Sequence, residues 1–499
     1  MKNKITTNIN NEKVDRLKKF ERIKAEAMSP YAERYDKQIL CQDVKGLPMG
    51  TKIKTAGRIV LLRDMGKIIF VQLYDFSGKI QIVLNFKETD EVKFKLFMKI
   101  ANLGDFIGVE GEVFTTKKGE ISILVKDYTF LSKALRSLPE KWHGLRDVEK
   151  KYRKRYLDLI MNEDTRQVFK FRSDFIRELR NFYQENGFYE VDTPVLCNNA
   201  SGALAKPFIT HHNALDMDVF LRIAPEIYLK EAIIGGYDKI FEVARSFRNE
   251  GMDSSHLQEF TIIEHYVAYW NFKDNMAFTE KMFTTIIKKL LGSLKFEILN
   301  RQGESIEIDF TASWQTVSFR ELLLVDCGID IDKFLTAEKL LKEIKKKKIK
   351  LDEPEKLGRG NLIDALYKTV SRHKIINPTF LINHPLDLSP LARKNDTNPL
   401  TVDRFQLVVN GWEIVNAYSE LIDPVEQVKR FDKQMQVKAA GDEEAMLKDD
   451  EYVEAMEYGM PPISGWGLGV ERIVALLTKQ SNLRDVVLFP LMKLEVGAE

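Results

Sequence analysis

A polar segment between Ile240 and Tyr266 holds the side chains of this chain that are best suited to bind a ligand. Its sequence, IFEVARSFRNEGMDSSHLQEFTIIEHY, predicts two strands joined by a polar loop. Side chains alternate across a strand, so Phe260, Ile262 and Glu264 should share one face with Tyr266. A ring, a carboxylate and a phenol suit a pocket for a flat ring and a cation better than a core. The sequence leaves a second interpretation open, a surface hairpin with incidental charge.

A second polar strand face is predicted between residues 405 and 421, in FQLVVNGWEIVNAYSEL. Asn416, Tyr418 and Glu420 alternate and should share one face, whereas Glu413 falls in the opposite phase. After a gap, PPISGWGLGVERIVALL is rich in glycine and predicts a helix that carries Arg472 in its first turns. These segments and residues 201–230 have to be considered together with the hairpin.

The glycines of this chain do not predict a phosphate-binding loop. The sequence contains no GxxxxGK[ST] motif. Gly465, Gly467 and Gly469 precede a helix, but no βαβ unit surrounds them, so a dinucleotide fold is only weakly indicated. If a nucleotide binds, arginines and a metal ion must hold its phosphates.

The length and composition limit the classes of protein that this chain can be. With 499 residues it should form more than one domain. A net charge of +2 gives no indication of a nucleic-acid partner. The three scattered cysteines, Cys41, Cys197 and Cys327, support neither a disulfide framework nor a zinc site. There is no apolar run of transmembrane length and no signal peptide, so we expect no membrane partner and a cytoplasmic location.

Two regions precede the main polar segments. Residues 1–48 predict a charged helical extension, and residues 49–135 predict five short strands, as in an OB-fold barrel. Phe70 should point outward from this barrel, where OB-folds stack nucleic-acid bases. Residues on neighbouring strands or their ends could bind base edges: Arg63, Gln81 and Glu120. A plain structural barrel with a surface aromatic residue is the alternative.

The remaining chain predicts an α+β domain. Residues 136–164 predict a basic connector, and residues 165–499 predict a domain with a helical insertion at about 320–372. Predicted strands do not alternate regularly with helices, so we expect a mixed or antiparallel sheet. They are residues 189–196, 220–224, 239–244, 260–269, 379–383, 405–418 and 485–490.

Long motifs resemble a known family. FRNE at 247–250, His256, EFTIIEHY at 259–266 and GLGVER at 467–472 resemble motifs 2 and 3 of class II aminoacyl-tRNA synthetases, and the helix and strand ending at Pro194 resemble motif 1. Residues 141–160, 206–230 and 416–424 resemble lysyl-tRNA synthetases more narrowly. The resemblance covers nearly the whole chain. It implies a homodimeric enzyme that activates L-lysine with ATP, releasing pyrophosphate, and then transfers lysine to the 3′ end of tRNA(Lys).

The resemblance also implies roles for single residues. Arg248 and Arg472 would be catalytic, and Glu413 would bind Mg²⁺. The implied ATP site consists of Arg248, Glu250, His256, Phe260, Glu413 and Arg472. The implied lysine site consists of Gly202, Glu226, Glu264, Tyr266, Asn416, Tyr418 and Glu420, with Glu420 pairing the ε-ammonium. The implied anticodon-binding residues are Arg63, Phe70, Gln81 and Glu120.

The sequence departs from the family pattern at two places. The family usually has glutamate at position 406, as a second Mg²⁺ ligand, where this chain has Gln406, and it commonly has Arg-His-Asn-Pro where this chain has residues 255–258, SHLQ. Alternatives to the lysine enzyme are an aspartyl- or asparaginyl-tRNA synthetase, a lysyltransferase that modifies a translation factor, and a catalytically weak RNA-binding or regulatory protein.

Overall fold

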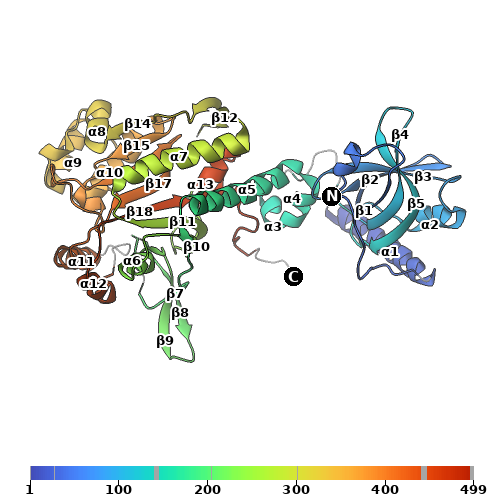
Figure 1. Ribbon diagram of the computed structural model, residues 1–499, viewed down its shortest axis with the longest axis horizontal. Coiled ribbons are helices and arrows are strands. Elements are labelled where there is room, and N and C mark those ends of the chain that lie inside the picture. The colour runs from blue at the N-terminus through green and yellow to red at the C-terminus, as the bar shows by residue number, and fades with distance from the viewer. Residues whose placement is uncertain are drawn as a thin grey trace. The chain divides into compact units, whose positions relative to one another are not determined.

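A computed structural model of the chain divides it into two compact units, Met1–Arg146 and Asp147–Glu499 (Figure 1). The structure describes residues 2–26, 28–139, 145, 147–199, 201–203, 205–300, 302–439 and 447–494. Part of the predicted connector, residues 140–144 and 146, lies outside the described residues. The rest of the connector divides between the units, because its helices α3 (Val148–Arg153) and α4 (Arg155–Met161) belong to the second unit.

The first unit is a closed five-stranded barrel, which confirms the predicted OB-fold. The strands follow the order β1 (Lys52–Asp64), β2 (Ile68–Tyr74), β3 (Lys79–Asn85), β5 (Ile121–Ser132) and β4 (Phe106–Thr115). Strand β2 alternates as predicted, because Ile69, Val71 and Leu73 are buried in the barrel core and Phe70 is not. The unit also contains the short helices η1 (Asp43–Gly46) and α2 (Glu91–Ile100). Asp90 caps the start of α2, because its side chain accepts a hydrogen bond from Lys93 N.

Helix α1 (Lys2–Ala25) packs against the barrel rather than standing free in solvent. Ile23 is fully buried and belongs to the barrel core. Arg16 donates from Nη1 to the backbone oxygens of Leu103 and Ala134, over 3.0 and 3.1 Å. The predicted charged extension therefore contributes apolar and polar contacts to the first unit.

A mixed eight-stranded sheet forms the centre of the second unit, as the sequence predicts. Neighbouring strands are antiparallel except for the two end pairs, β14–β15 and β10–β6. The order is β14 (Gln315–Ser318), β15 (Thr379–Ile382), β16 (Arg404–Val409), β17 (Trp412–Ser419), β18 (Ile463–Gly469), β11 (Glu259–Ala268), β10 (Lys239–Phe247) and β6 (Tyr189–Glu190).

Helices cover one face of this sheet and leave the other face for a cavity. Helices α5 (Glu163–Glu185), α7 (Phe272–Leu291) and α13 (Val470–Leu477) share one hydrophobic core with the sheet, and α7 crosses strands β16 to β18 (Figure 1). A second apolar cluster holds α8 (Phe319–Cys327), α9 (Ala337–Lys346) and α10 (Arg359–Val370), in the predicted helical region.

Smaller elements surround the sheet. Helix α6 (Glu226–Ile234) packs against β11 and, with α11 (Pro424–Ala439) and α12 (Asp450–Glu457), forms a third cluster. The remaining strands are β7 (Leu196–Cys197), β8 (Phe208–His212), β9 (Met217–Leu221), β12 (Lys295–Leu299) and β13 (Ser305–Asp309). The remaining 3₁₀ turns are η3 (Ile331–Lys333), η4 (Pro354–Lys356), η5 (Arg372–Lys374), η6 (Leu386–Leu388) and η7 (Leu483–Val486). Within the described part of the chain, no helix combines the length and apolar character that crossing a membrane requires.

Four local strand predictions were wrong. Residues 405–418 form two strands, β16 and β17, joined by a turn at Asn410 and Gly411, instead of one. Residues 189–196 form two short strands instead of one, and residues 220–224 form a strand only as far as Leu221. Residues 485–490 lie in the turn η7 and an irregular segment, because Arg155 rather than a neighbouring strand donates to the backbone oxygens of Arg484 and Leu488. The glycine-rich run before α13 is the central strand β18.

Candidate active site

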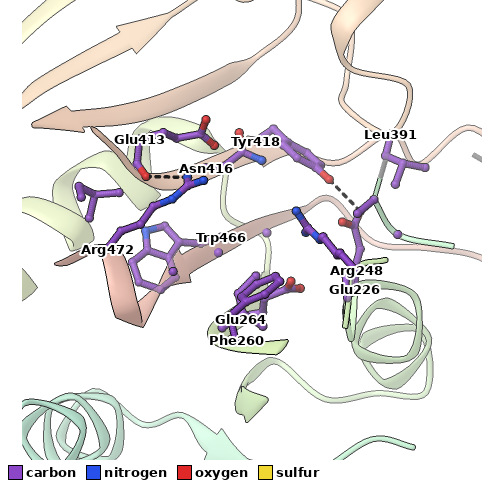
Figure 2. A pocket seen from close by; sticks show the side chains of 18 of the residues that line it. Glu226, Arg248, Phe260, Glu264, Leu391, Glu413, Asn416, Tyr418, Trp466 and Arg472 are labelled. Atoms are coloured by element: carbon purple, nitrogen blue, oxygen red, sulfur yellow. Dashed lines mark hydrogen bonds between the residues drawn. The ribbon is translucent and has the colours of Figure 1, made fainter. Parts of the chain in front are cut away.

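A cavity of about 340 Å³ lies over strands β11, β17 and β18 (Figure 2). Helix α6, the loop after β10 and residues 388–392 complete its walls. Its size and its mixture of apolar walls with a few charged groups are typical of a small-molecule site.

Strand β11 presents the predicted face to this cavity. Phe260, Ile262, Glu264 and Tyr266 line it. The opposite face packs into the core, where His265 lies between Tyr183 Oη at 2.9 Å and Asn275 Oδ1 at 2.8 Å. Burial lowers the pKa of His265 to about 3, so this histidine is neutral and structural.

A β-bulge brings Glu413 to the cavity. Leu407 pairs with Val415, but the next residue, Val408, pairs with Glu413, so Ile414 is an extra residue in β17. The bulge shifts the phase of the strand and places Glu413 on the cavity side with Asn416 and Tyr418 (Figure 2). Simple alternation predicted the opposite phase, because a bulge of this kind leaves no clear mark in the sequence.

Buried carboxylates gather at one end of the cavity. Tyr418 Oη donates to Glu226 Oε1 over 2.8 Å, and Tyr266 Oη donates to Glu264 Oε2 over 3.3 Å. Burial and the nearby charge of Glu226 raise the pKa of Glu264 to about 8. Gly202 lines the same end, where a Cβ would lie 3.1 Å from the Cβ of Glu226. This end of the cavity is suited to ammonium groups.

Glu420 lies behind the wall of this end and does not line the cavity itself. It is buried, and its Oε2 lies 2.6 Å from Nζ of Lys230, which also pairs with Glu226. The sequence analysis did not single out Lys230. The signal was available, because Glu226 and Lys230 are four residues apart in a helix whose only other charged residue is Glu231.

Both predicted arginines line the cavity: Arg472 lies across it from Glu226, beside Glu413, and Arg248 lies near Phe260 (Figure 2). The guanidinium of Arg248 lies 5.1 Å from the centroid of the Phe260 ring, and its Nε is buried without a hydrogen-bond partner among the described residues. Arg472 donates from Nη1 to the backbone oxygen of Glu413 over 3.1 Å (Figure 2). Glu471, next to Arg472, instead accepts from Thr261 N and from Arg172. Two guanidinium groups and an aromatic ring in one cavity suit an aromatic base with phosphates.

The loop after β10 forms another part of the cavity wall. Glu250, Ser255, His256 and Leu257 line the cavity. His256 faces Asp253, with Nδ1 and Oδ2 2.9 Å apart, and Ser254 O accepts a hydrogen bond from Leu483 N over 3.0 Å. The unusual sequence at the tip therefore has contacts within the loop and with η7.

The structure brings together nearly all of the predicted ligand-binding residues. Of the predicted lysine and ATP residues, only Glu420 lies outside the cavity lining: Gly202, Glu226, Arg248, Glu250, His256, Phe260, Glu264, Tyr266, Glu413, Asn416, Tyr418 and Arg472 line it. Arg404 was missed; it also lines the cavity and donates to Asn416 Oδ1 over 2.8 Å. Gln406 is nearly buried and does not line the cavity. No group of three or more metal-binding side chains occurs in the described ranges.

The predicted nucleic-acid residues share one region of the barrel surface. Arg63 and Phe70 are register partners on β1 and β2. Gln81 donates to Ser122 Oγ over 2.9 Å, and Glu120 lies in the turn just before this serine. An aromatic ring with polar neighbours on an open barrel face is suited to stacked bases.

Comparisons with known proteins agree with this geometry. The family model for class II tRNA synthetases (D, K and N) matches residues 147–493, and the model for the OB-fold nucleic acid binding domain matches residues 53–131. A lysine–tRNA ligase of Pelotomaculum thermopropionicum is 42% identical over 481 residues, which are 96% of this chain and 94% of the relative. Lysine–tRNA ligases of Aquifex aeolicus (44% identity, 89% of this chain, 73% of the relative) and Thermotoga maritima (41%, 96% of each) are also similar.

The matched residues include the cavity lining and the barrel surface. Because the family model covers more than half of the chain and the relatives align along most of their own length, the chain belongs to the class II tRNA synthetase family of the D, K and N type, among its lysine–tRNA ligases.

Proposed function

We propose that this chain joins L-lysine to tRNA(Lys) in two steps. In the first, a lysine carboxylate oxygen attacks the α-phosphorus of ATP and pyrophosphate leaves, which gives lysyl-adenylate. In the second, a hydroxyl of the terminal ribose attacks the lysyl carbonyl carbon and AMP leaves. The observation that carries the proposal is one cavity that combines buried carboxylates with two guanidinium groups and an aromatic ring.

The carboxylate end is proposed to bind lysine. Glu226 and Glu264 face the α-ammonium side beside Gly202, and the side chain extends between Tyr266, Asn416 and Tyr418 toward Glu420. Glu420 pairs with the ε-ammonium. Its Oε1 supports this role, because it is buried and has no hydrogen-bond partner among the described residues.

The part of the cavity lined by Phe260, Glu413 and Arg472 is proposed to bind ATP. Phe260 and Arg472 hold the adenine between them, and Arg248 grips the α-phosphate and the lysine carboxylate through its planar fork. Glu250 and His256 contact the nucleotide. No side chain acts as a nucleophile, so Arg248 and Arg472 accelerate the first step by positioning and by stabilising the charge that develops on the phosphate.

Mg²⁺ is the proposed cation in this part of the cavity. The donor set fits an ion that is carried mainly by ATP, because Glu413 offers one carboxylate and Mg²⁺ commonly combines one or two carboxylates with substrate phosphates and water. When bound, the ion would neutralise phosphate charge. Gln406 offers only an uncharged oxygen and is nearly buried, so we assign it no more than a weak contribution.

The barrel is proposed to bind the anticodon. Phe70 stacks on a base, and Arg63, Gln81 and Glu120 bind base edges of a uridine-rich anticodon. The partly exposed ring and its register with Arg63 support this assignment.

We further propose a homodimer in the cytoplasm. Large apolar side chains that are exposed around β6 to β9 support a second copy as partner: Tyr189, Leu196, Ile209, Leu215 and Tyr237. Light scattering of the purified protein should give twice the mass of 57.8 kDa.

The alternatives have less support. An aspartate or asparagine enzyme needs a cationic or amide-reading pocket, whereas this pocket holds Glu226, Glu264 and Glu420. A lysyltransferase resembles the catalytic part alone, but this chain also has the matching barrel. Only Gln406 and the loop tip favour a catalytically weak protein.

ATP–pyrophosphate exchange with each amino acid tests the proposal directly. Exchange should depend on lysine, and charging should require tRNA(Lys). Binding of tRNA without exchange for any amino acid would instead favour the catalytically weak RNA-binding alternative.

A further inference from the structure

A lysine of the protein itself lies at the closed end of the proposed lysine pocket. Lys230 has no exposed side-chain surface, and its Nζ pairs with Glu226 and with Glu420 Oε2. Ring centroids of three tyrosines lie 5.7 to 6.0 Å from this nitrogen: Tyr266, Tyr418 and Tyr452. A buried ammonium in this position influences every carboxylate around it.

Glu420 directs its second oxygen toward the cavity. Oε1 lies 2.3 Å from the position that a Cβ on Gly465 would take, and Gly465 lines the cavity. Both oxygens are buried and have no hydrogen-bond partner in the described part of the chain, but Oε2 lies in the ion pair with Lys230. Glu420 therefore holds Lys230 on one oxygen and offers the other oxygen to a ligand.

The charges of the pocket can be counted. When all three carboxylates are ionised, as in the complex with lysine, Glu226, Glu264 and Glu420 contribute three negative charges and Lys230 one positive charge, which leaves two negative charges. The two ammonium groups of a lysine ligand neutralise these two negative charges, and the guanidinium of Arg248 neutralises the lysine carboxylate. Without Lys230, one buried negative charge would remain unmatched, and a buried unpaired charge is costly.

We propose that Lys230 determines the specificity of the lysine pocket. Its ammonium matches one of the three carboxylates, so that the pocket accepts two further ammonium groups, and it holds Glu420 with Oε1 toward the substrate side chain. Lys230 acts through Glu226 and Glu420 and is a positioning residue. The inference depends on the proposed lysine pocket.

Three variants test the inference by titration of lysine and norleucine in ATP–pyrophosphate exchange. Glu420→Gln leaves the Lys230 charge to repel the ε-ammonium, so its lysine KM should rise by about 100-fold, as for a buried charge pair that loses one partner. Lys230→Met should raise the lysine KM by about tenfold. Without the ammonium beside it, Glu420 takes up a proton, and the neutral carboxyl group attracts the ε-ammonium of lysine less strongly. In both variants the ATP KM should stay within about threefold, and the preference for lysine over norleucine should fall.

The double variant Lys230→Met/Glu420→Gln decides between the inference and a merely structural role. It removes both charges, so its lysine KM should be at least about fivefold lower than that of Glu420→Gln alone. A structural role predicts a KM equal to or higher than that of Glu420→Gln. Such a result would overturn the inference, as would a Lys230→Met variant with lysine KM and norleucine discrimination within twofold of wild type.

The double variant and a control variant keep the test informative even if a single variant does not fold. The double variant removes both partners of the Lys230–Glu420 pair, which proteins tolerate better than the loss of one partner. Lys239→Met is the matched control, because the ammonium of Lys239 also lies near two rings, at 5.9 Å from Phe188 and 5.7 Å from Trp270, but outside the active-site cavity. Its lysine KM should stay near wild type. If the wild-type protein shows no lysine-dependent exchange, the proposed function itself is wrong. If the wild-type protein is active but the variants behave as a structural role predicts, only the inference about Lys230 is wrong.

Discussion

Arg472 donates a hydrogen bond to the backbone oxygen of Glu413 over 3.1 Å. This bond connects the start of α13 to the bulge in β17, two elements whose residues are far apart in the sequence. It leaves the carboxylate of Glu413 free to face the cavity (Figure 2). The proposed cation ligand and the proposed adenine-stacking residue therefore hold each other in place.

The Mg²⁺ dependence of exchange should depend on Glu413. In Glu413→Gln, the Mg²⁺ concentration for half-maximal exchange should rise about tenfold, because Mg²⁺ prefers charged oxygen ligands. Gln406→Glu should leave this concentration unchanged or lower it, since it adds a carboxylate on the neighbouring strand β16. An unchanged Mg²⁺ requirement in Glu413→Gln would contradict the assignment.

A methyl group on Gly465 should block the lysine pocket. Its Cβ would lie 2.3 Å from Glu420 Oε1 and 2.4 Å from Tyr266 Cε1, both closer than contact distance. Gly465→Ala should therefore raise the lysine KM by about five- to 150-fold, as expected if overpacking that costs about 1–3 kcal/mol opposes lysine binding. Gly46→Ala is the control, because a Cβ at Gly46 meets no atom within 4 Å. Equal lysine KM values for the two variants would argue against a lysine site beside Gly465.

The sequence predicted the parts of this fold that depend on simple patterns. Alternation on β2 and β11 correctly separated core side chains from those facing outward or into the cavity. It failed for Glu413, because a bulge changes the phase of β17. It also failed for residues 485–490, because an apolar run predicts a strand, whereas Arg155 donates a hydrogen bond to the backbone of this segment. Partnerships between distant residues, such as Lys230 with Glu420, depend on the tertiary structure and leave only a weak signal in one sequence.

Lysine use should depend on pH through Glu264, whose pKa is raised to about 8 by burial and by Glu226. Below pH 8 the Glu264 carboxyl of the free protein therefore carries a proton, whereas an ammonium ligand binds the ionised Glu264 carboxylate. The kcat/KM for lysine should therefore rise close to tenfold between pH 6.5 and 7.5 and level off above pH 8. Glu264→Gln should have a lower kcat/KM and lose this rise. A wild-type profile that stays flat over this range would show that Glu264 does not titrate on binding.

Phe70 should contribute to tRNA binding and not to lysine activation. Stacking on a base contributes about 1–3 kcal/mol, so Phe70→Ala should raise the tRNA KM in aminoacylation by about five- to 150-fold. Exchange without tRNA should remain at the wild-type level, because the proposed lysine and ATP sites lie in the other unit. Phe76→Ala is the matched control. Phe76 is 68% exposed in the turn between β2 and β3 and, unlike Phe70, does not pair with Arg63 in the barrel. If both substitutions raise the tRNA KM equally, general surface hydrophobicity explains the effect; if neither does, the barrel face around Phe70 does not bind the anticodon.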